Sequence, residues 1–231
     1  MIIDSSLLKA RFVQRNNRFL VAARLGNRRV LAHLPNPGRL KELLRPGADI
    51  LLVNRAGKGR KTRYQVLGVV DSGESILLDT RLSNLIAEEA ITKGRILPLT
   101  GYEVLKREFS WGGSRFDFLL RKRSSNCIVE VKACTLLKGS TAMFPDAPTL
   151  RGRRHVDTLS KAVRSGFRAC VLFMVHRKGA ELFLANSETD PKFSESMANA
   201  MKAGVEVYAY ECRWLDQRVE IARPLPVASS F

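Results

Sequence analysis

Short apolar runs separated by turn residues fill the first third of the chain and predict a series of β-strands. The predicted strands are Ala10–Gln14, Arg18–Leu25, Arg28–Leu34, Asp49–Asn54, Arg63–Val70 and Ser75–Leu78. Gly26-Asn27 is a hairpin-turn signal, and Pro35–Gly38 interrupts the chain after the third run. About five strands with a brief helical turn predict a small β-barrel, and the oligonucleotide-binding (OB) barrel is the basic example of that class.

From residue 81 onward, helical patterns alternate with strands. Arg81–Lys93 predicts a helix that ends at Gly94. The expected apolar face of this helix consists of Leu82, Leu85, Ile86 and Ala90. Further strands are predicted at Tyr102–Phe109, Arg115–Leu120, Cys127–Ala133, Arg168–His176, Glu181–Ala185 and Val205–Tyr210, and further helices at Arg151–Ser165 and after Asp190.

This order of elements predicts a second domain of the α/β class with a mixed central sheet. The change of pattern near residue 80 divides the chain into predicted domains 1–80 and 81–231. Within the second domain, the apolar run in Arg168–His176 is typical of a strand buried on both faces, and Glu181–Ala185 is expected to pair with it. Lys138–Leu150, which contains two prolines and one glycine, is predicted to be a loop.

Three charged side chains lie inside the otherwise apolar hairpin of the second domain. Residues two apart in a strand share a face, so Glu130 and Lys132 project together and strand pairing brings Asp117 beside them. In the strand Arg115–Leu120, the same alternation places three apolar residues on the opposite face from Asp117, namely Phe116, Phe118 and Leu120. A lone Glu-x-Lys pair is more often solvated, but buried charges are costly unless they are paired or bind a metal. This cluster is therefore the candidate site.

The residue types of the cluster suit metal-assisted cleavage of a phosphodiester. Mg²⁺ prefers oxygen ligands and keeps several waters, so Asp117, Glu130 and the backbone carbonyl of Val131 are sufficient ligands. Lys132 is placed to orient a water or to stabilise charge on the phosphate oxygens. Glu89 falls within the expected apolar face of the first helix, where it forms either a structural ion pair or a support for the site.

Charge is the strongest signal in the composition. The chain has 39 lysine and arginine residues against 22 acidic residues, which gives a formal net charge of +17 and a pI near 10.3. The basic residues cluster at 11–29, 55–63, 121–123 and 151–168, which indicates a polyanionic partner such as nucleic acid. None of the clusters lies on a long amphipathic helix, and no apolar run is long enough to span a bilayer, so no membrane partner is expected.

Two regions combine cations with other groups that contact nucleic acids. The helix predicted from Arg151 begins with cations that oppose its dipole, which indicates that anions bind there, although a solvated basic face is the alternative. The candidate contacts in the second domain are Arg115, Thr149, Arg151, Arg154 and His155. In the first domain, the candidates near the interrupted strand are His33, Asn36 and Arg39. Turn chemistry explains the asparagine equally well.

The cysteines and the N-terminus favour a cytoplasmic protein. Four cysteines lie far apart without CxxC spacing, which fits neither a disulfide framework nor a zinc site. The N-terminal residues lack a basic region followed by an apolar run, so no signal peptide is expected. We therefore expect a reducing cytoplasm, and association with the nucleoid is compatible with the charge.

These motifs resemble those of the sugar fermentation stimulation protein A family. The resemblance rests on SRFDFLL, VEVKACTL and FPDAPTLRGRRH in the second domain, together with HLPNPGRL in the barrel and AEEAI in the first helix. It implies an N-terminal OB-like domain followed by a restriction-endonuclease-like α/β domain similar to PD-(D/E)xK nucleases. It also implies a protein that binds DNA.

The resemblance extends to individual residues. Asp117 matches the nuclease aspartate, Glu130 and Lys132 match the E-x-K pair, and Glu89 matches an acidic residue of the first helix. Phe116 departs from the pattern, because the motif is named for a proline there. The family's own segment is matched by Asp146, Thr149, Arg151, Gly152 and His155.

Three functional hypotheses follow from the sequence. The leading one is a DNA-binding protein with a nuclease-type site that uses Mg²⁺ or Mn²⁺. The second is a non-catalytic, sequence-nonspecific DNA-binding regulator that retains a nuclease-like fold. The third is an RNA-binding factor, since basic barrels also bind RNA. A homodimer would help a nuclease to reach both strands, and the sequence leaves the oligomeric state open.

Overall fold

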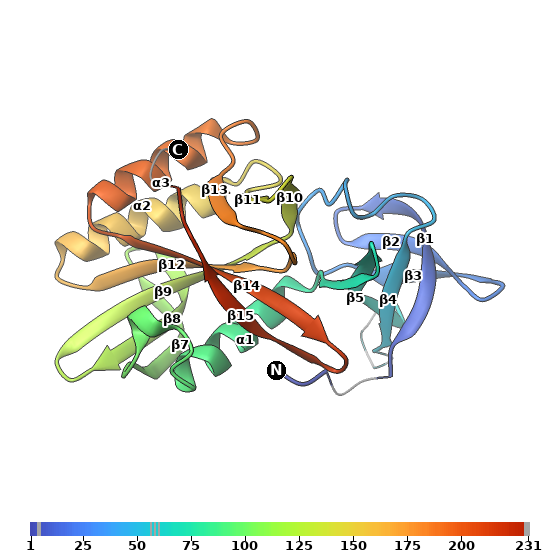
Figure 1. The fold of residues 1–231 in the computed structure, drawn as a ribbon, viewed down its shortest axis with the longest axis horizontal. Helices are drawn as coiled ribbons and strands as arrows, with labels where there is room; N and C mark the ends of the chain where they lie inside the picture. The colour runs from blue at the N-terminus through green and yellow to red at the C-terminus, as the bar shows by residue number, and fades with distance from the viewer. Residues whose placement is uncertain (4–5, 56, 58, 60, 229–231) are drawn as a thin grey trace. The chain divides into compact units, whose positions relative to one another are not determined.

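The computed structural model describes residues 1–3, 6–55, 57, 59 and 61–228, and it divides into two compact units (Figure 1). The first unit comprises Met1–Leu82 and Arg213–Val219, and the second comprises Ser83–Cys212 and Glu220–Phe231. Residues 56, 58 and 60 of the basic cluster at 55–63 lie outside the described residues. Within the described part of the chain, no helix is long and apolar enough to cross a membrane.

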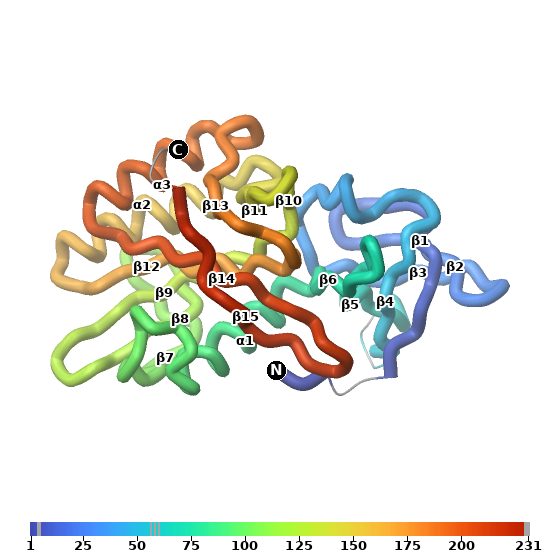
Figure 2. Tube along the Cα trace, in the orientation of Figure 1, coloured from blue at the N-terminus to red at the C-terminus, as the bar shows by residue number. Residues whose placement is uncertain are grey.

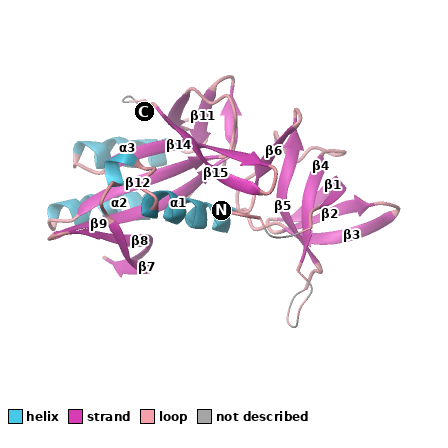
Figure 3. Cartoon of the chain, turned by 60° about the horizontal axis from the view of Figure 1, so that its bottom comes forward, coloured by secondary structure: helices cyan, strands magenta, loops and turns pink. Residues whose placement is uncertain are grey.

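The first unit is a β-barrel (Figure 3). Its strands are β1 (Leu8–Asn17), β2 (Leu20–Leu25), β3 (Arg28–His33), β4 (Asp49–Asn54), β5 (Tyr64–Asp71) and β6 (Glu74–Leu77). Antiparallel pairs join β1 to β2 and β4, β2 to β3, and β4 to β5, and a parallel β3–β5 pair closes the ring. The sixth strand pairs with β5. The predicted OB-like barrel is thus confirmed.

Alternation of side chains fills the barrel, as the pattern predicted. Ala10 and Phe12 of β1 are buried with Val21 of β2 and Ile50 of β4, whereas Arg11 between the first two is exposed. A strand with one face on a core and one in water shows this two-residue period. The core of the first unit therefore follows directly from the sequence.

A segment close to the C-terminus belongs to the first unit, which a single division after residue 80 does not anticipate. Arg213–Val219 is the turn region between strands β14 (Glu206–Leu215) and β15 (Arg218–Leu225), and the tube in Figure 2 shows this hairpin in red. The backbone N–H of Ile3 donates to the carbonyl of Gln217 at 2.6 Å. Such pairing links segments that are distant in sequence, and no local pattern predicts it.

Gly68 of β5 lies against this segment. A Cβ added at Gly68 would lie 2.5 Å from the carbonyl oxygen of Ile76 and 2.6 Å from the indole ring of Trp214. Both distances are far shorter than a normal carbon contact, so only glycine allows this close approach. The glycine is therefore a packing requirement of the first unit.

We expect Gly68→Ala to destabilise the protein by about 1–3 kcal/mol, because overpacking forces neighbouring backbone to move. Gly57→Ala is the matched control, since a Cβ at Gly57 would have no heavy atom within 4 Å. The free energy of unfolding, measured by denaturant titration, should fall only for the first variant. Equal stability of the two variants would contradict the contact.

The second unit is built on a six-stranded mixed sheet in the order β15-β14-β12-β9-β8-β7 (Figure 1). The remaining strands of this sheet are β7 (Glu103–Trp111), β8 (Ser114–Lys122), β9 (Ser125–Cys134) and β12 (Arg168–Val175). β12 runs parallel to both β9 and β14, whereas β7, β8 and β9 are antiparallel. The predicted mixed α/β class is confirmed.

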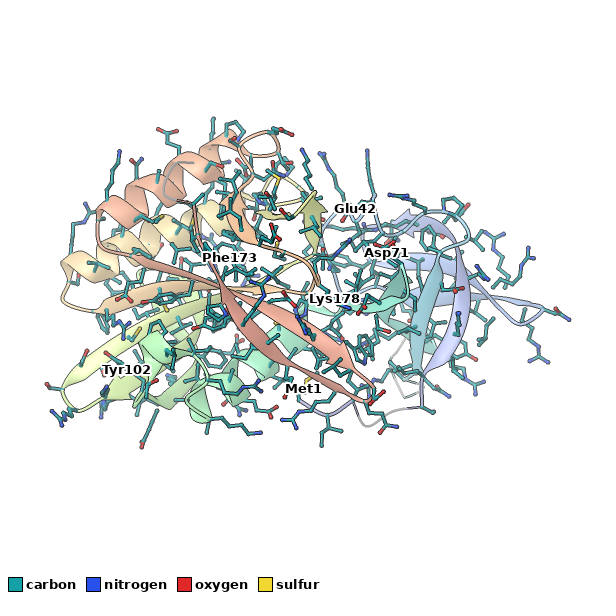
Figure 4. All side chains as sticks on the ribbon, viewed as in Figure 1. Met1, Glu42, Asp71, Tyr102, Phe173 and Lys178 are labelled. Atoms are coloured by element: carbon teal, nitrogen blue, oxygen red, sulfur yellow. The ribbon has the colours of Figure 1, made fainter. Side chains whose placement is uncertain are left out.

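Two helices pack against this sheet in one core. α2 (Leu150–Arg164) buries Val156 and α3 (Pro191–Lys202) buries Phe193 together with Phe173 of β12, which is labelled in Figure 4. The carboxylate of Asp190 caps α3 by accepting from the N–H of Phe193 at 3.0 Å, and its other oxygen accepts from the N–H of Thr149, the cap of α2, at 2.8 Å. One aspartate thus connects the starts of both helices.

A small second sheet corrects two predictions. It contains β10 (Leu136–Lys138), β11 (Thr141–Phe144) and β13 (Leu182–Ala185). The segment Lys138–Leu150, predicted as a loop, therefore contains a strand, and β13 pairs in parallel with β11 instead of with β12. The apolar residues Ala142, Met143 and Phe144 could have indicated the strand, but the neighbouring prolines dominated the interpretation.

The first helix has almost the predicted bounds. α1 spans Thr80–Thr92 and ends where Gly94 adopts a φ of 65°. The N–H of Arg95 donates to the carbonyl of Ala90, and the N–H of Gly94 donates to that of Ile91, which is the Schellman arrangement. The glycine at position 94 therefore correctly predicted where the helix ends.

Candidate active site

Asp117 lies at the end of the β8–β9 pairing, where its side chain accepts the hydrogen bond that the next backbone pair would make. The ladder between the strands ends at Phe118, which pairs with Val129. Oδ2 of Asp117 accepts the backbone N–H of Val131 at 2.7 Å, a bond that a backbone carbonyl makes in a continuous ladder. Oδ1 accepts from Nδ2 of Asn84 in α1 at 2.6 Å. Both oxygens of Asp117 are thus held by neighbouring elements.

The structure also places Phe116 differently from the prediction. Strict alternation predicted Phe116 opposite Leu119, but both belong to one core with Ile128. The ring of Phe116 contacts that of His155 edge to face, with 5.5 Å between centroids. Strict alternation therefore does not hold at this point, although β8 begins at Ser114 and Phe116 is still paired with Phe109 of β7.

Glu130 is the buried carboxylate of the cluster. It lies on β9 with 3% exposure, and its Oε1 accepts from Nζ of Lys132 and from Nδ1 of His155, the latter at 2.6 Å. Oε2 of Glu130 has no hydrogen-bond partner among the described residues. An unsatisfied carboxylate oxygen in a dry site is costly, so this atom marks a position for a cation or a donor.

The two carboxylates have different proton affinities. Burial raises the pKa of Glu130, but the charge of Lys132 and the hydrogen bond from His155 outweigh burial and leave the pKa of Glu130 below its usual value. For Asp117, burial and then the charge of Glu130 raise the pKa to about 6. Glu130 therefore carries the negative charge of the site, and Asp117 keeps its proton until near neutral pH.

His155 does not contact solvent, which corrects its predicted role as a nucleic-acid contact. It is 1% exposed, and Nε of Arg151 lies 3.4 Å from its Nε2 while its Nδ1 lies against Glu130. Because Arg151 can only donate, Nε2 is the acceptor and Nδ1 carries the proton that is donated to Glu130. His155 thus positions Glu130, and Arg151 is the exposed end of the chain of contacts.

The start of α2 contains the other predicted contacts of the second unit. Oγ1 of Thr149 accepts the N–H of Gly152 at 3.0 Å, so this side chain caps the helix. A Cβ at Gly152 would lie 2.8 Å from the Thr149 side chain, which explains the glycine. Arg151 and Arg154 are exposed in the first turns. Arg115 is also exposed and pairs with Glu108 of β7 at 2.8 Å.

α1 is rotated relative to the prediction, and Glu89 contacts Lys93. Leu85, expected in the core, is 47% exposed, and Glu89 forms an ion pair with Lys93 one turn further on. The residue of α1 that contacts Asp117 is Asn84. The buried face of the helix consists of Ser83, Ile86, Ala87, Ala90 and Ile91. Glu89 therefore acts as a partner of Lys93.

A buried polar pair fixes this rotation. Oγ of Ser83 lies 2.8 Å from Nε2 of His176, which directly follows β12, and both side chains are at most 4% exposed. Burial lowers the pKa of His176 to about 4, so the imidazole is neutral. Since Ser83 and Asn84 are consecutive, anchoring Ser83 directs Asn84 toward Asp117. Ser83, His176 and Asn84 were missed, because a single serine or asparagine in a helix carries no strong sequence signal.

The cluster offers oxygen ligands to a cation. Asp117 and Glu130 contribute carboxylates, and the two backbone groups of a strand residue face the same side, so the Val131 carbonyl lies on the side where its N–H meets Asp117. No group of three or more His, Cys, Asp or Glu side chains within the described chain could hold a metal. Asp117, Glu130 and the Val131 carbonyl offer oxygen atoms, which are the ligands that hard divalent cations prefer.

The predicted contacts of the first unit differ in accessibility. Asn36 is 5% exposed, its Nδ2 donates to the carbonyl of Leu78 at 2.9 Å, and its Oδ1 accepts the N–H of Gly38 at 2.8 Å. The turn interpretation therefore describes Asn36, and its side chain is not available to a nucleic acid. Arg39 is exposed, and His33 lines a pocket on the barrel.

These features define a two-domain protein in which an OB-like barrel precedes a mixed α/β domain with a carboxylate–lysine cluster in its sheet. The chain belongs to the sugar fermentation stimulation protein family. Residues 13–78 match the family model described as the SfsA N-terminal OB domain, and residues 81–218 match the sugar fermentation stimulation protein RE domain.

Relatives cover nearly the whole chain. A sugar fermentation stimulation protein homolog of Chloroflexus aurantiacus is 41% identical over 225 residues, which are 97% of this chain and 87% of that protein. A homolog of Methanothermobacter thermautotrophicus is 41% identical over 91% of this chain and 87% of its own length. A solved structure of Pyrococcus furiosus SfsA in complex with Ca²⁺ is 34% identical, with a TM-score of 0.92 and 99% of each chain covered.

We expect Asp117→Asn to stabilise the metal-free protein at pH 8, by at most about 3 kcal/mol for a pKa raised from 3.8 to about 6. The folded protein binds this proton more tightly than the unfolded chain, so the stabilising contribution of the proton is present below pH 4 and is lost as the pH rises through 6. The substitution removes that loss, and its benefit should shrink toward pH 4.

The measurement is thermal unfolding in EDTA at pH 4, 6 and 8. Asp157→Asn is the matched control, because it removes an exposed carboxylate from α2 by the same chemical change and alters the net charge equally at pH 8. A benefit of Asp117→Asn that is the same at every pH, or that the control shares, would show that the carboxylate is not held in a costly ionised state.

Proposed function

We propose that the protein binds DNA and hydrolyses phosphodiester bonds at a PD-(D/E)xK-type site that requires Mg²⁺ or Mn²⁺. The observation that carries the proposal is the buried Glu130, whose Oε1 is held by Lys132 and His155 while its Oε2 lacks a described partner beside Asp117. An acidic pair with an adjacent ammonium is the arrangement that metal-dependent phosphodiester cleavage uses.

Asp117, Oε2 of Glu130 and the carbonyl of Val131 would hold the cation. Support comes from the all-oxygen donor set and from the relative of Pyrococcus furiosus, whose structure is described as a complex with Ca²⁺. Ca²⁺ and Mg²⁺ are both hard cations with oxygen ligands, although Mg²⁺ requires a tighter geometry. When bound, such a cation activates a water and neutralises charge that develops on the phosphate.

The side chains of the chain itself perform the remaining tasks. The side chain of Lys132 is 16% exposed and its ammonium lies against Glu130, where it would orient the attacking water or bind a phosphate oxygen. His155 keeps one oxygen of Glu130 occupied, which directs the other oxygen toward the cation. Arg151 and Arg154, exposed on α2, bind the neighbouring phosphates.

Duplex binding would depend mainly on phosphate contacts. A net charge of +17 supplies many cations, and neutralising phosphates releases counterions regardless of base sequence. The second candidate function, a regulator that binds DNA without cutting it, is favoured by one observation. Both oxygens of Asp117 already accept hydrogen bonds, from Val131 and Asn84, so this carboxylate is satisfied without a metal.

We expect Lys132→Ala to reduce cleavage by about 100-fold or more, as the loss of one charge-stabilising donor does in other enzymes. Supercoiled, linear, branched and single-stranded DNA are incubated with Mn²⁺ or Mg²⁺, and products are resolved on gels. Lys161→Ala, which removes an exposed lysine from α2, is the control for charge. Cutting that survives in Lys132→Ala would refute its role, and no cutting of any substrate by the unmodified protein would favour the regulator.

We also expect Glu130→Gln to weaken Mn²⁺ binding by about tenfold or more, since even partners of metal ligands change affinity by 10–100-fold. Isothermal titration calorimetry measures this binding in the absence of DNA, so the result does not depend on activity. Glu195→Gln, which changes an exposed residue of α3, is the matched control. Equal affinities of the two variants would contradict the assignment of Glu130 as a ligand.

A further inference from the structure

The barrel of the first unit carries a pocket that the nuclease proposal does not use. Its volume is about 550 Å³, within the range of small-ligand sites. It opens between the β1–β2 turn, the outer face of β3 and the residues that precede β5. The lining residues that matter here are Phe19, Leu31, His33, Lys61, Gln65 and Arg81. All of them belong to the first unit.

One wall of the pocket is apolar and exposed. Phe19 is 45% exposed and Leu31 is 46% exposed, although large apolar side chains usually gain stability by burial. The backbone of Phe19 is fixed, because its N–H donates to Oδ1 of Asn17 and its carbonyl accepts from the N–H of Leu34, both at 2.9 Å. The turn therefore fixes the backbone that carries the ring, and the ring itself lies 5.7 Å from the Arg18 guanidinium and 6.4 Å from the His33 ring, between centroids. This order limits the entropy lost when a flat ligand stacks on Phe19.

The polar residues that line the pocket are held in place by a buried carboxylate. Asp79 is 1% exposed and accepts from Nε and Nη2 of Arg81, at 2.9 and 2.7 Å, and from Nε2 of Gln65 at 2.8 Å. This bidentate pairing fixes the plane of the guanidinium. Because it uses Nε and Nη2, the Nη1 donors of Arg81 are the ones that would contact a ligand. Lys61 is an exposed second cation at the pocket. The polar side thus suits a phosphate together with groups that accept hydrogen bonds.

We propose that this pocket binds an unstacked nucleotide of single-stranded nucleic acid, with the base on Phe19 and the phosphate at Arg81 and Lys61. The inference rests on the proposed nucleic-acid binding and specifies the partner of the barrel. An unpaired base has the flat apolar face that the exposed ring requires, whereas bases in a duplex are stacked and cannot enter the pocket. Residues 1–82 contain 16 lysine and arginine residues against 6 aspartate and glutamate residues, which favours an anionic polymer.

The test compares a labelled oligothymidylate with a duplex of equal length by fluorescence anisotropy, in EDTA at one salt concentration. Phe19→Ala should weaken binding of the single strand by about tenfold, since stacking on an aromatic residue contributes about 1–3 kcal/mol per base. Binding of the duplex should change by less than about twofold. Phe19→Trp should retain binding of the single strand. Leu97→Ala, at an exposed apolar residue outside the pocket, should change neither.

Three outcomes would overturn the inference. They are equal loss of single-strand and duplex binding in Phe19→Ala, no loss in Phe19→Ala, and competition by free thymidine monophosphate at the same concentration as the oligomer. The proposed function fails in a different way. If the unmodified protein binds neither nucleic acid, the proposed function is refuted as well. If the unmodified protein binds duplex and Phe19→Ala changes neither duplex nor single-strand binding, only the pocket proposal is refuted.

Discussion

The burial of Glu130 is the constraint on which the candidate site depends. A carboxylate inside a sheet is destabilising unless partners replace its water, and removing one partner of a buried charge pair typically costs about 3–5 kcal/mol. Lys132 and His155 supply those partners from β9 and α2. The capping of α2 by Thr149, and the close approach at Gly152, hold His155 at the required place. The site therefore depends on how α2 begins as well as on β9.

Asp117 depends on a second set of supports. The β8–β9 ladder stops at Phe118 and does not include Asp117. The N–H of Val131 is therefore left to donate to the Asp117 carboxylate. Its other oxygen requires a fixed rotation of α1, which the buried contact between Ser83 and His176 provides. Two carboxylates with unequal pKa values, on β8 and β9, are thereby held by contacts from α1 and α2.

The sequence predicted the parts of this arrangement that follow from local periodicity. The strand period of two placed Glu130 and Lys132 together, and the turn signals separated the barrel strands. The rotation of α1 could not be predicted, because small residues such as Ala87 face the core while Leu85 does not. Likewise, whether His155 would face a ligand or Glu130 depends on packing between distant segments. Local patterns carry no information on such partners.

The charge of the site separates the two proposed functions. A protein with a net charge of +17 attracts phosphates, but the negative charge of Glu130 repels them. Lys132 contacts this carboxylate directly, and Arg151 is connected to it through His155. A protein that only binds DNA gains no affinity from a carboxylate at this position. An apolar residue at position 130 would avoid the cost of burying the charge. A divalent cation held by Asp117 and Glu130 would reverse this balance, because it would supply positive charge beside Oε2 and toward the phosphate. The buried carboxylate therefore favours the nuclease over the regulator.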